Sequence, residues 1–259
     1  MKRRQLLYGV LMSVVVGMCV PMGALAQDDA KEIDIKALSR KLDTMFRSKT
    51  TRAKMRMEIV TPNYERTLTM EMLTRGQDDA LIRIQSPRKE KGISTLKKGN
   101  EMWNYLPKVK KVIRVPPSMM TSSWMGSDMT NDDLVQNSSW EDDYDVSQLK
   151  DVPTGEFCLQ FTPHEDAPVT WSKVVACFDA KYQLPKTQSF YDEKGTKVRE
   201  IKMDKYKKVD DRLIPSRITI TPLSKDKKGN KTTMIYESIA FDVDIDEAEF
   251  SLANLRRGK

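Results

Sequence analysis

The sequence predicts a mainly β fold with few helices, arranged as one large, strongly curved antiparallel sheet or open barrel. Polar and apolar residues alternate with a period of two in one short segment after another, which is typical of half-buried antiparallel strands. Polar turns such as KKGN, VDDR and KDKKGN separate these segments. No internal repeat or flexible linker divides the chain, so we expect about eleven strands in one sheet rather than two separate domains.

The first 26 residues have the features of a cleavable secretory signal peptide. Basic residues at positions 2–4 precede an apolar run over residues 6–20, and Pro21 and a small-residue site ending at Ala26 follow. The run is shorter than the roughly 20 residues that a membrane-spanning helix needs. Cys19 does not follow a small residue, so we expect it to be lost with the signal rather than lipidated. The paired arginines also fit a twin-arginine signal, which leaves the export route open.

Residues 27–259 are therefore expected to form a single domain in the periplasm. The chain has 44 Lys and Arg against 37 Asp and Glu, and the basic residues at positions 2–4 leave with the signal. The small positive charge that remains does not favour a nucleic-acid partner, and export argues against one as well. No further long apolar run follows, so we expect this domain to be soluble.

After the signal, IDIKALSRKLDTMF is the one long segment with helical periodicity. Its basic residues fall away from an apolar stripe, as in an amphipathic helix. The stripe consists of Ile35, Leu38, Leu42, Met45 and Phe46. We therefore expect one helix over residues 35–46.

The first half of the predicted sheet is rich in methionine at inward positions. The candidate inward residues are Met55, Met57, Ile59, Leu68, Met70, Met72, Ile82 and Ile84. Further strands are expected in GISTL, EMWNYL and VKKVIRV. Apolar residues occupy both phases of EMWNYL, so either face could hold Trp103 and Tyr105. A wall of flexible methionines can repack around ligands of differing shape, but plain packing against the amphipathic helix would explain the same pattern.

The second half continues the strand pattern after the acidic segment WEDDYD, which is expected to turn the chain through solvent. Its strand candidates are FCLQF, VTWSKVVACF, PKTQSFY, TKVREIKMDKYKKV, RLIPSRITITPL and KTTMIYESIAFDVD. Cys158 and Cys177 lie in two of these segments and form a plausible disulfide in an oxidising compartment. Two buried thiols in neighbouring strands are the alternative. A bridge closing a loop of about 20 residues would contribute ~3 kcal/mol.

The sequence contains no recognisable catalytic or cofactor-binding signature. GxSxG, HExxH, a phosphate-binding glycine loop and CxxC are all missing from the sequence, so we expect no catalytic residues, no cofactor and no enzyme. His164 lies in a polar turn and is expected to be a solvated loop residue. Glu141, Asp142, Asp143 and Asp145 lack the glycine and the regular spacing of a calcium loop. We therefore expect a solvated acidic turn and no metal site.

Between the two halves, the stretch PPSMMTSSWMGSDMTNDDLV combines prolines with soft apolar residues. Pro116 and Pro117 cannot donate to a strand ladder, so they end the strand before them. The large apolar residues that follow are Met119, Met120, Trp124 and Met125. They are expected to lie within two helical turns that Gly126 ends, and Asp128 or Thr130 would cap a second short helix. Such an excursion fits a lid over the open face of a curved sheet.

The segment EMWNYLPKVKKVIRVPPSMMTSSWMGSDMTNDDLV resembles the hallmark segment of the outer membrane lipoprotein-sorting protein family, a branch of the LolA-like superfamily. Residues 103–134 are the specific part; the opening helix, the Met-rich strands and the closing IAFDVDIDEAEFSLANL are similar in order and pattern. The resemblance implies an unclosed antiparallel β-barrel with helices covering its concave face. It also implies a hydrophobic cavity that carries lipid or lipoprotein acyl chains, and association with an RND-type (MMPL-like) exporter.

We therefore expect a periplasmic carrier that binds acyl chains and hands them on between membranes without bond making. The candidate ligand contacts are the eight inward residues named above, together with Trp103, Tyr105, Met119, Met120, Trp124 and Met125. A charged rim would meet an inner-membrane exporter or an outer-membrane acceptor. Two alternatives stay open: a sensor or accessory module of an exporter that does not shuttle, and a structural protein with a filled core.

Overall fold

A computed structural model of the protein describes residues 33–135 and 138–257. Residues Asp34–Lys259 form one compact unit. The predicted signal peptide, residues 1–26, lies outside the described residues. Within the described part of the chain, no helix has both the length and the apolar character needed to cross a membrane.

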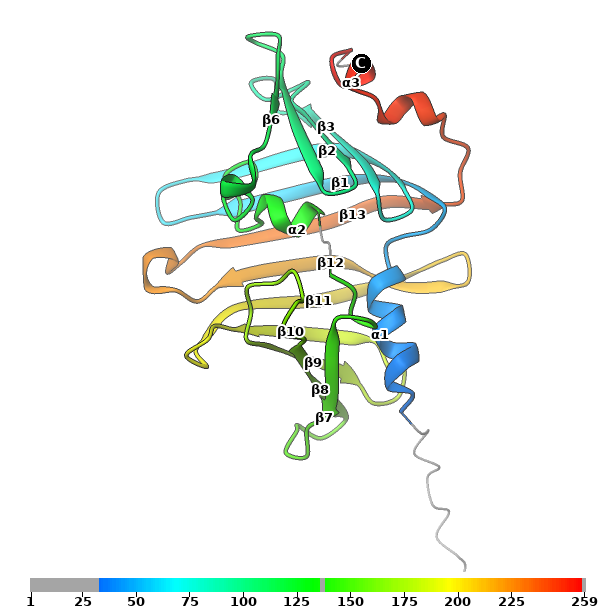
Figure 1. Cartoon of the computed structure of the whole chain (residues 1–259), viewed down its shortest axis with the longest axis vertical. Helices are drawn as coiled ribbons and strands as arrows, with labels where there is room; N and C mark the ends of the chain where they lie inside the picture. Colours follow the sequence, from blue (N-terminus) through cyan, green and yellow to red (C-terminus); the bar gives the residue numbers. More distant parts are fainter. Residues whose placement is uncertain (1–32, 136–137, 258–259) are drawn as a thin grey trace, which may run out of the picture. The chain divides into compact units, whose positions relative to one another are not determined.

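The described residues form one antiparallel sheet of 13 strands that is not closed (Figure 1). The first six strands are β1 (Thr50–Val60), β2 (Glu65–Arg75), β3 (Asp79–Ser86), β4 (Ser94–Lys98), β5 (Glu101–Leu106) and β6 (Lys111–Arg114). The other seven are β7 (Tyr144–Gln148), β8 (Glu156–Pro163), β9 (Lys173–Asp179), β10 (Pro185–Tyr191), β11 (Lys197–Val209), β12 (Arg212–Pro222) and β13 (Lys231–Phe241). The expected mainly β, unclosed antiparallel architecture is confirmed.

The order of the strands joins the first and last strands in the middle of the sheet. From β1, each new strand is added beside the previous one as far as β6, and the chain then crosses to β7 at the opposite edge. From β7 the strands are added inward until β13 pairs with β1. Each half is therefore a local meander, and the β1–β13 ladder connects the two.

The predicted opening helix is present as α1 (Ile35–Thr44), which lies over one face of the sheet (Figure 1). Asp34 caps it, because its carboxylate accepts a hydrogen bond from the backbone N–H of Ala37 at 2.9 Å. Just after the helix, the ring of Phe46 stacks on Tyr236 of β13 with centroids 4.9 Å apart. We call the face that carries α1 the inner face.

Strand alternation sorts the apolar residues of the first half onto two faces. The buried inner cluster consists of Ala53, Met55, Met57, Ile59, Leu68, Met70, Ile82, Ile84, Met102, Trp124, Val135, Met234 and Tyr236. The outer cluster consists of Leu73, Leu81, Leu96, Tyr105, Phe250 and Leu255. The C-terminal 3-10 turn η3 (Glu247–Phe250) and helix α3 (Leu252–Leu255) supply its last two members and so cover the outer face at β3 and β4.

Cys158 and Cys177 form the expected disulfide, which connects β8 and β9. The two residues are directly opposite each other in the ladder, and Leu159 and Ala176 are the next facing pair. Ala176 is opposite Gln188 of β10, whose side chain lies on the inner face. Because successive side chains point to opposite faces, the disulfide lies on the outer face.

The segment WEDDYD forms the expected turn over residues 140–142, but it does not run freely through solvent. Its end begins β7, a strand that the sequence pattern did not predict and that pairs with β8. Trp140 stacks on Tyr144 with ring centroids 5.2 Å apart and meets Phe161 edge-on at 5.0 Å. These aromatic contacts hold the segment against the sheet despite its acidic composition.

Candidate functional site

Two adjoining cavities lie between α1, the inner face of the sheet and the segment that precedes β7. The first has a volume of about 190 Å³ and the second of about 260 Å³. Each is smaller than the roughly 300–1,000 Å³ of a typical ligand pocket, whereas the two together fall within that range. Both are lined by Leu42, Phe46, Met129, Asp133, Met234 and Tyr236. Because they share these walls, we describe them together as the inner groove.

Methionine side chains form much of the sheet side of the first cavity. These residues are Met55, Met70, Met72, Met102 and Met234. They come from β1, β2, β5 and β13, where alternation in each strand directs them to the inner face. Methionine has an unbranched, polarizable side chain that fills irregular gaps. This wall can therefore adjust to an apolar chain without a fixed shape.

The second cavity extends the groove over the other half of the sheet. Its apolar lining includes Trp140, Tyr144, Trp171, Phe190, Ile201, Met203, Ile218 and Ile220. Sequence reasoning selected no residue here. The period-two alternation of REIKM and RITIT was a usable signal for an inward face, but the absence of a methionine cluster made these strands look ordinary.

The residues expected to contact a ligand separate into groups in the structure. Met55, Met70, Met72, Ile82 and Trp124 line the first cavity. Met57, Ile59, Leu68 and Ile84 are buried in the inner cluster without lining either cavity. Met120 and Met125 are partly buried against the same cluster. Met119, with 51% of its surface exposed, lines neither cavity.

Trp103 and Tyr105 lie in the outer cluster. The register of β4 and β5 pairs Lys97 with Met102 and Leu96 with Trp103, so Met102 takes the inner position and Trp103 the outer one. The sequence could not decide this phase, because both faces of β5 carry large apolar residues. We exclude Trp103 and Tyr105 from the ligand contacts proposed below.

Residues 115–135, which we call the cover segment, are less helical than expected. A single 3-10 turn, η1 (Pro117–Met119), comes first, and α2 (Asn131–Val135) comes last. Between them the backbone N–H of Trp124 donates to the carbonyl of Met129 at 2.7 Å, and Met125 and Gly126 have φ values of 52° and 71°. The expectation of two helical turns through Trp124 and Met125 is therefore wrong, since this loop takes their place.

Hydrogen bonds from the sheet hold the cover segment in position. The indole N–H of Trp124, a side chain only 2% exposed, donates to the Thr95 hydroxyl at 3.1 Å. The guanidinium of Arg66 donates to the carbonyl of Met125, and the Tyr64 hydroxyl donates to that of Gly126 at 3.2 Å. These bonds tie the loop to β2, to the turn before β2 and to β4.

Helix α2 has a hydrogen-bonded N-terminal cap and an ion pair with the second half of the sheet. Thr130 caps it as predicted: its hydroxyl accepts from the N–H of Asp133 at 3.1 Å, and the Asp133 carboxylate accepts from the N–H of Thr130 at 2.7 Å. The same carboxylate pairs with Arg199 of β11 at 2.8 Å. The cover segment thus spans from the β2–β4 side of the groove to β11.

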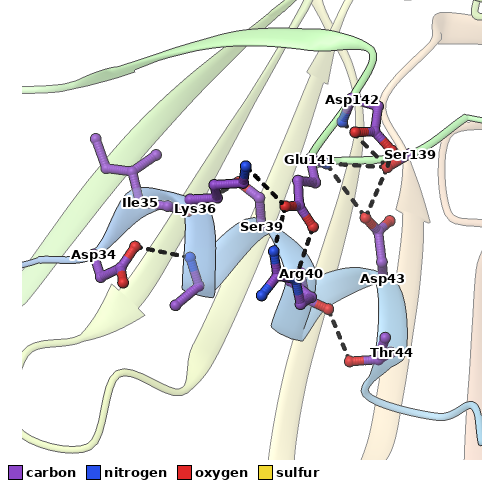
Figure 2. Close-up of polar contacts among 11 residues, drawn as sticks. Asp34, Ile35, Lys36, Ser39, Arg40, Asp43, Thr44, Ser139, Glu141 and Asp142 are labelled. Atoms are coloured by element: carbon purple, nitrogen blue, oxygen red, sulfur yellow. Dashed lines mark hydrogen bonds and ion pairs between the residues drawn. The ribbon is translucent and has the colours of Figure 1, made fainter.

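A polar latch holds α1 against residues 139–142 (Figure 2). The Asp43 carboxylate accepts from the Ser139 hydroxyl at 3.0 Å and from the N–H of Trp140 at 2.9 Å. Burial raises the pKa of Asp43, and these donors oppose that shift. Arg40 donates two hydrogen bonds to Glu141, at 2.6 and 2.9 Å, and lowers the pKa of that carboxyl. Glu141 is therefore a latch residue and not part of a solvated turn.

Lys97 brings a buried charge to one end of the first cavity, which also contains Arg47, Thr74 and Asp79. Its side chain lies on the inner face of β4, opposite Met102. Burial, and then the positive charge of Arg47, lower the pKa of Lys97 to about 8, while Asp78 and Asp79 act in the other direction. The first cavity therefore has an apolar wall and a polar end.

Among the residues that the structure describes, one group of possible metal ligands lies close together outside the groove. Glu156, Cys158 and Cys177 lie within 4.8 Å of one another, but the two sulfurs are bonded to each other and offer no thiolate ligand. His164 is exposed just after β8, with its ring 3.4 Å from the carboxylate of Asp145. It occupies the loop position that its sequence context predicts.

A family model described as "uncharacterized protein" matches residues 76–257 of the chain. No curated protein matches the chain. The family model therefore covers most of the sheet, the cover segment and the C-terminal helices.

Solved structures share the fold over nearly the whole described unit. A domain from Vibrio parahaemolyticus named after outer membrane lipoprotein sorting is 22% identical, with a TM-score of 0.72, over 86% of this chain and 98% of that one. A DUF1329 family protein from Desulfovibrio piger is 21% identical, with a TM-score of 0.72, over 85% and 97%. A LolA superfamily protein from Nitrosomonas europaea is 18% identical, with a TM-score of 0.70, over 86% and 100%.

Proposed function

Because the chain belongs to the family of uncharacterized proteins whose model it matches, and has the LolA superfamily fold, we propose that it is a periplasmic carrier of acyl chains. In this proposal residues 1–26 are a cleaved signal peptide and residues 27–259 are one lipid- or lipoprotein-binding domain. The inner groove receives the acyl chains and releases them at another membrane, without a chemical reaction. An inner-membrane exporter of the RND (MMPL-like) type or an outer-membrane acceptor is the proposed protein partner.

The observation that carries this proposal is the methionine-lined inner groove beneath α1. Burial of each methylene of an acyl chain is worth ~0.8 kcal/mol, so a 16-carbon chain offers a gross gain on the order of 12 kcal/mol. Ordering of the chain and of the protein reduces this gain considerably. A flexible, incompletely filled wall suits a carrier, since it binds an apolar chain without gripping one shape.

Helix α1 is the element that we propose opens the groove. Of its ten residues, only Leu38 and Ser39 are buried. Its other fixed contacts include the hydrogen bonds of the polar latch to residues 139–142. The cover segment, by contrast, has the buried Trp124 pinned to Thr95. Displacement of α1 therefore exposes the groove while the cover segment stays in place.

The test has two steps. Native mass spectrometry and lipid extraction of protein purified from a periplasm should reveal a bound lipid or acylated peptide, and the protein should then speed the transfer of a fluorescent lipid between vesicles. Met129→Trp, which adds bulk at a wall shared by both cavities, should reduce both signals. Met119→Trp adds the same ring at an exposed site and is the matched control.

Binding without accelerated transfer would favour a module that does not shuttle, such as a sensor or an accessory part of an exporter. No bound lipid, no uptake of added phospholipid or acylated peptide, and no difference between Met129→Trp and Met119→Trp would contradict the carrier proposal.

A further inference from the structure

A row of small and polar residues crosses the inner face at the polar end of the first cavity. Facing pairs in successive ladders join Thr51 to Thr74, Thr74 to Ala80, and Ala80 to Lys97. The next row toward the groove floor contains Ala53, Met72 and Ile82 on the same strands. The polar row and the methionine wall are therefore adjacent, two residues apart along each strand.

Lys97 is a buried cation without a carboxylate partner in the described part of the chain. Its side chain belongs to a residue that is 5% exposed, and its Nζ donates to the backbone carbonyl of Gln77 at 2.5 Å. The nearby Asp79 is engaged by Arg75 at 2.6 Å. A buried charge is costly unless it is paired, so the neutral carbonyl alone leaves Lys97 short of a counter-ion.

Two buried hydroxyls lie in the same row. Thr51 is fully buried and Thr74 is 8% exposed, and the Oγ1 atoms of both have no hydrogen-bond partner among the described residues. Buried polar atoms are satisfied in the great majority of native structures, so an exception needs an explanation. Ala80, which lies between Thr74 and Lys97 in the row, has a short side chain and leaves room beside them. Of the two threonines only Thr74 lines the first cavity, so the arrangement offers one cation, one hydroxyl donor and space for an oxygen-rich group.

We propose that this row binds the anionic head group of an acyl lipid whose chain lies along the methionine wall. Lys97 is the counter-ion and Thr74 is the hydrogen-bond donor, while Arg47 adds a second positive charge to the same cavity. The recognised chemistry is a carboxylate or phosphate oxygen joined to a long alkyl chain. This inference rests on the proposed acyl-carrier function and specifies its cargo as an anionic lipid, rather than any apolar chain.

Binding of lipids with the same chain and different head groups tests this assignment. The probes are palmitate, monohexadecyl phosphate and hexadecanol, each titrated into the delipidated protein at pH 7. We expect both anionic lipids, or one of them, to bind about tenfold more tightly than hexadecanol, as a charged hydrogen-bonded contact provides. The tighter of the two identifies the head group as carboxylate or phosphate.

Lys97→Met should remove the preference and keep the affinity for hexadecanol, because the substitution replaces the charge with an apolar chain of similar length. Lys98→Met is the matched control: Lys98 is the next residue of β4, and its Nζ donates to the carbonyl of Phe250 on the outer face. It should leave the preference intact. Thr74→Val removes one hydroxyl without changing the shape of the side chain, and it should lower the preference for the anionic lipid. It is the test variant if Lys97→Met does not fold.

The outcomes separate this inference from the function on which it rests. Equal affinities of the wild-type protein for hexadecanol and both anionic lipids, or a preference that survives in both Lys97→Met and Thr74→Val, would overturn the head-group site while acyl binding stands. Failure of all three probes to bind would overturn both proposals.

Discussion

At the scale of single residues, Lys97 should make the stability of the protein depend on pH in an unusual direction. Its pKa is about 8 in the folded protein against 10.5 for an ordinary lysine. Between these values the unfolded chain binds more protons than the folded one, so the free energy of unfolding rises with pH. The rise amounts to about 3 kcal/mol over the whole window. Urea unfolding of delipidated protein from pH 7 to 10 should show it.

Lys97→Met is the control for this pH dependence. It should be more stable than the wild type at pH 7, because a buried unpaired charge is removed, and the rise above pH 8 should disappear. Tyr236 acts in the opposite direction, since burial raises its pKa to about 12 and stability is then lost as the pH rises above about 10. The comparison therefore stops at pH 10. Identical profiles for the two proteins would show that Lys97 is not a buried charge.

The residues that sequence reasoning placed correctly are those whose strand phase was unambiguous. Met55, Met70 and Met72 alternate with charged or polar neighbours, and the structure puts all three in the first cavity. Trp103 and Met102 are adjacent apolar residues, so alternation could not choose between them. Lys97 was missed for a different reason: KKGN was predicted to be a turn, whereas β4 continues to Lys98 and places Lys97 opposite Ala80 and Met102.

At the scale of elements, the latch between α1 and residues 139–142 should control how fast ligand leaves. Asp43→Asn keeps the size of the side chain but replaces one carboxylate oxygen with an NH2 group. That group cannot accept the hydrogen bond from Ser139 or Trp140 that the oxygen accepted. We expect the free energy of unfolding to fall by about 1–2 kcal/mol and a fluorescent fatty acid to dissociate faster. Urea unfolding and stopped-flow release measure the two effects.

Arg40→Met is the matched control on the same helix. Its side chain is 60% exposed and pairs with Glu141 at 2.6 Å, and such exposed pairs contribute little to stability because solvent screens them. Its effects should be smaller than those of Asp43→Asn. Unchanged release from Asp43→Asn would indicate that α1 does not gate the groove.

The disulfide should contribute to stability without affecting ligand binding. Replacing Cys158 and Cys177 with serine frees a loop of about 20 residues in the unfolded chain, and we expect the free energy of unfolding to fall by about 3 kcal/mol. Because the bridge lies on the outer face, affinity for lipid should stay the same. Thermal unfolding with and without lipid tests both statements, and a loss of affinity in the serine variant would contradict the second.

Local sequence signals predicted α1 and most of the strands, but not the cover segment. The helix and strands follow from a period of 3.6 or 2 maintained over several residues. The cover segment owes its conformation to tertiary hydrogen bonds, such as those from Arg66 to Met125 and from Trp124 to Thr95. A residue pattern that suits a short helix was overridden by these partners, which lie far away in the sequence.

At the scale of the whole described unit, the topology creates the groove. The pairing of β13 with β1 puts the methionine wall of the first half beside the aromatic lining of the second, and Met234 of β13 borders both cavities. Nothing in the alternation of either half specifies this pairing, so sequence reasoning found only the half that methionines marked. A groove built across both meanders also explains why neither cavity alone reaches the size of a usual ligand pocket.

If the two cavities act as one groove, a single lipid should perturb methionines in both. The methyl groups of Met72 and Met102 report on the first cavity, and that of Met203 reports on the second. In a titration followed by NMR of methyl-labelled methionine, all three signals should shift together and saturate at one equivalent of lipid. Met119, exposed on the cover segment, should not shift. If only Met72 and Met102 respond, or if Met203 responds with its own affinity, the cavities bind separately, and a long acyl chain does not extend beneath α1 from one half of the sheet to the other.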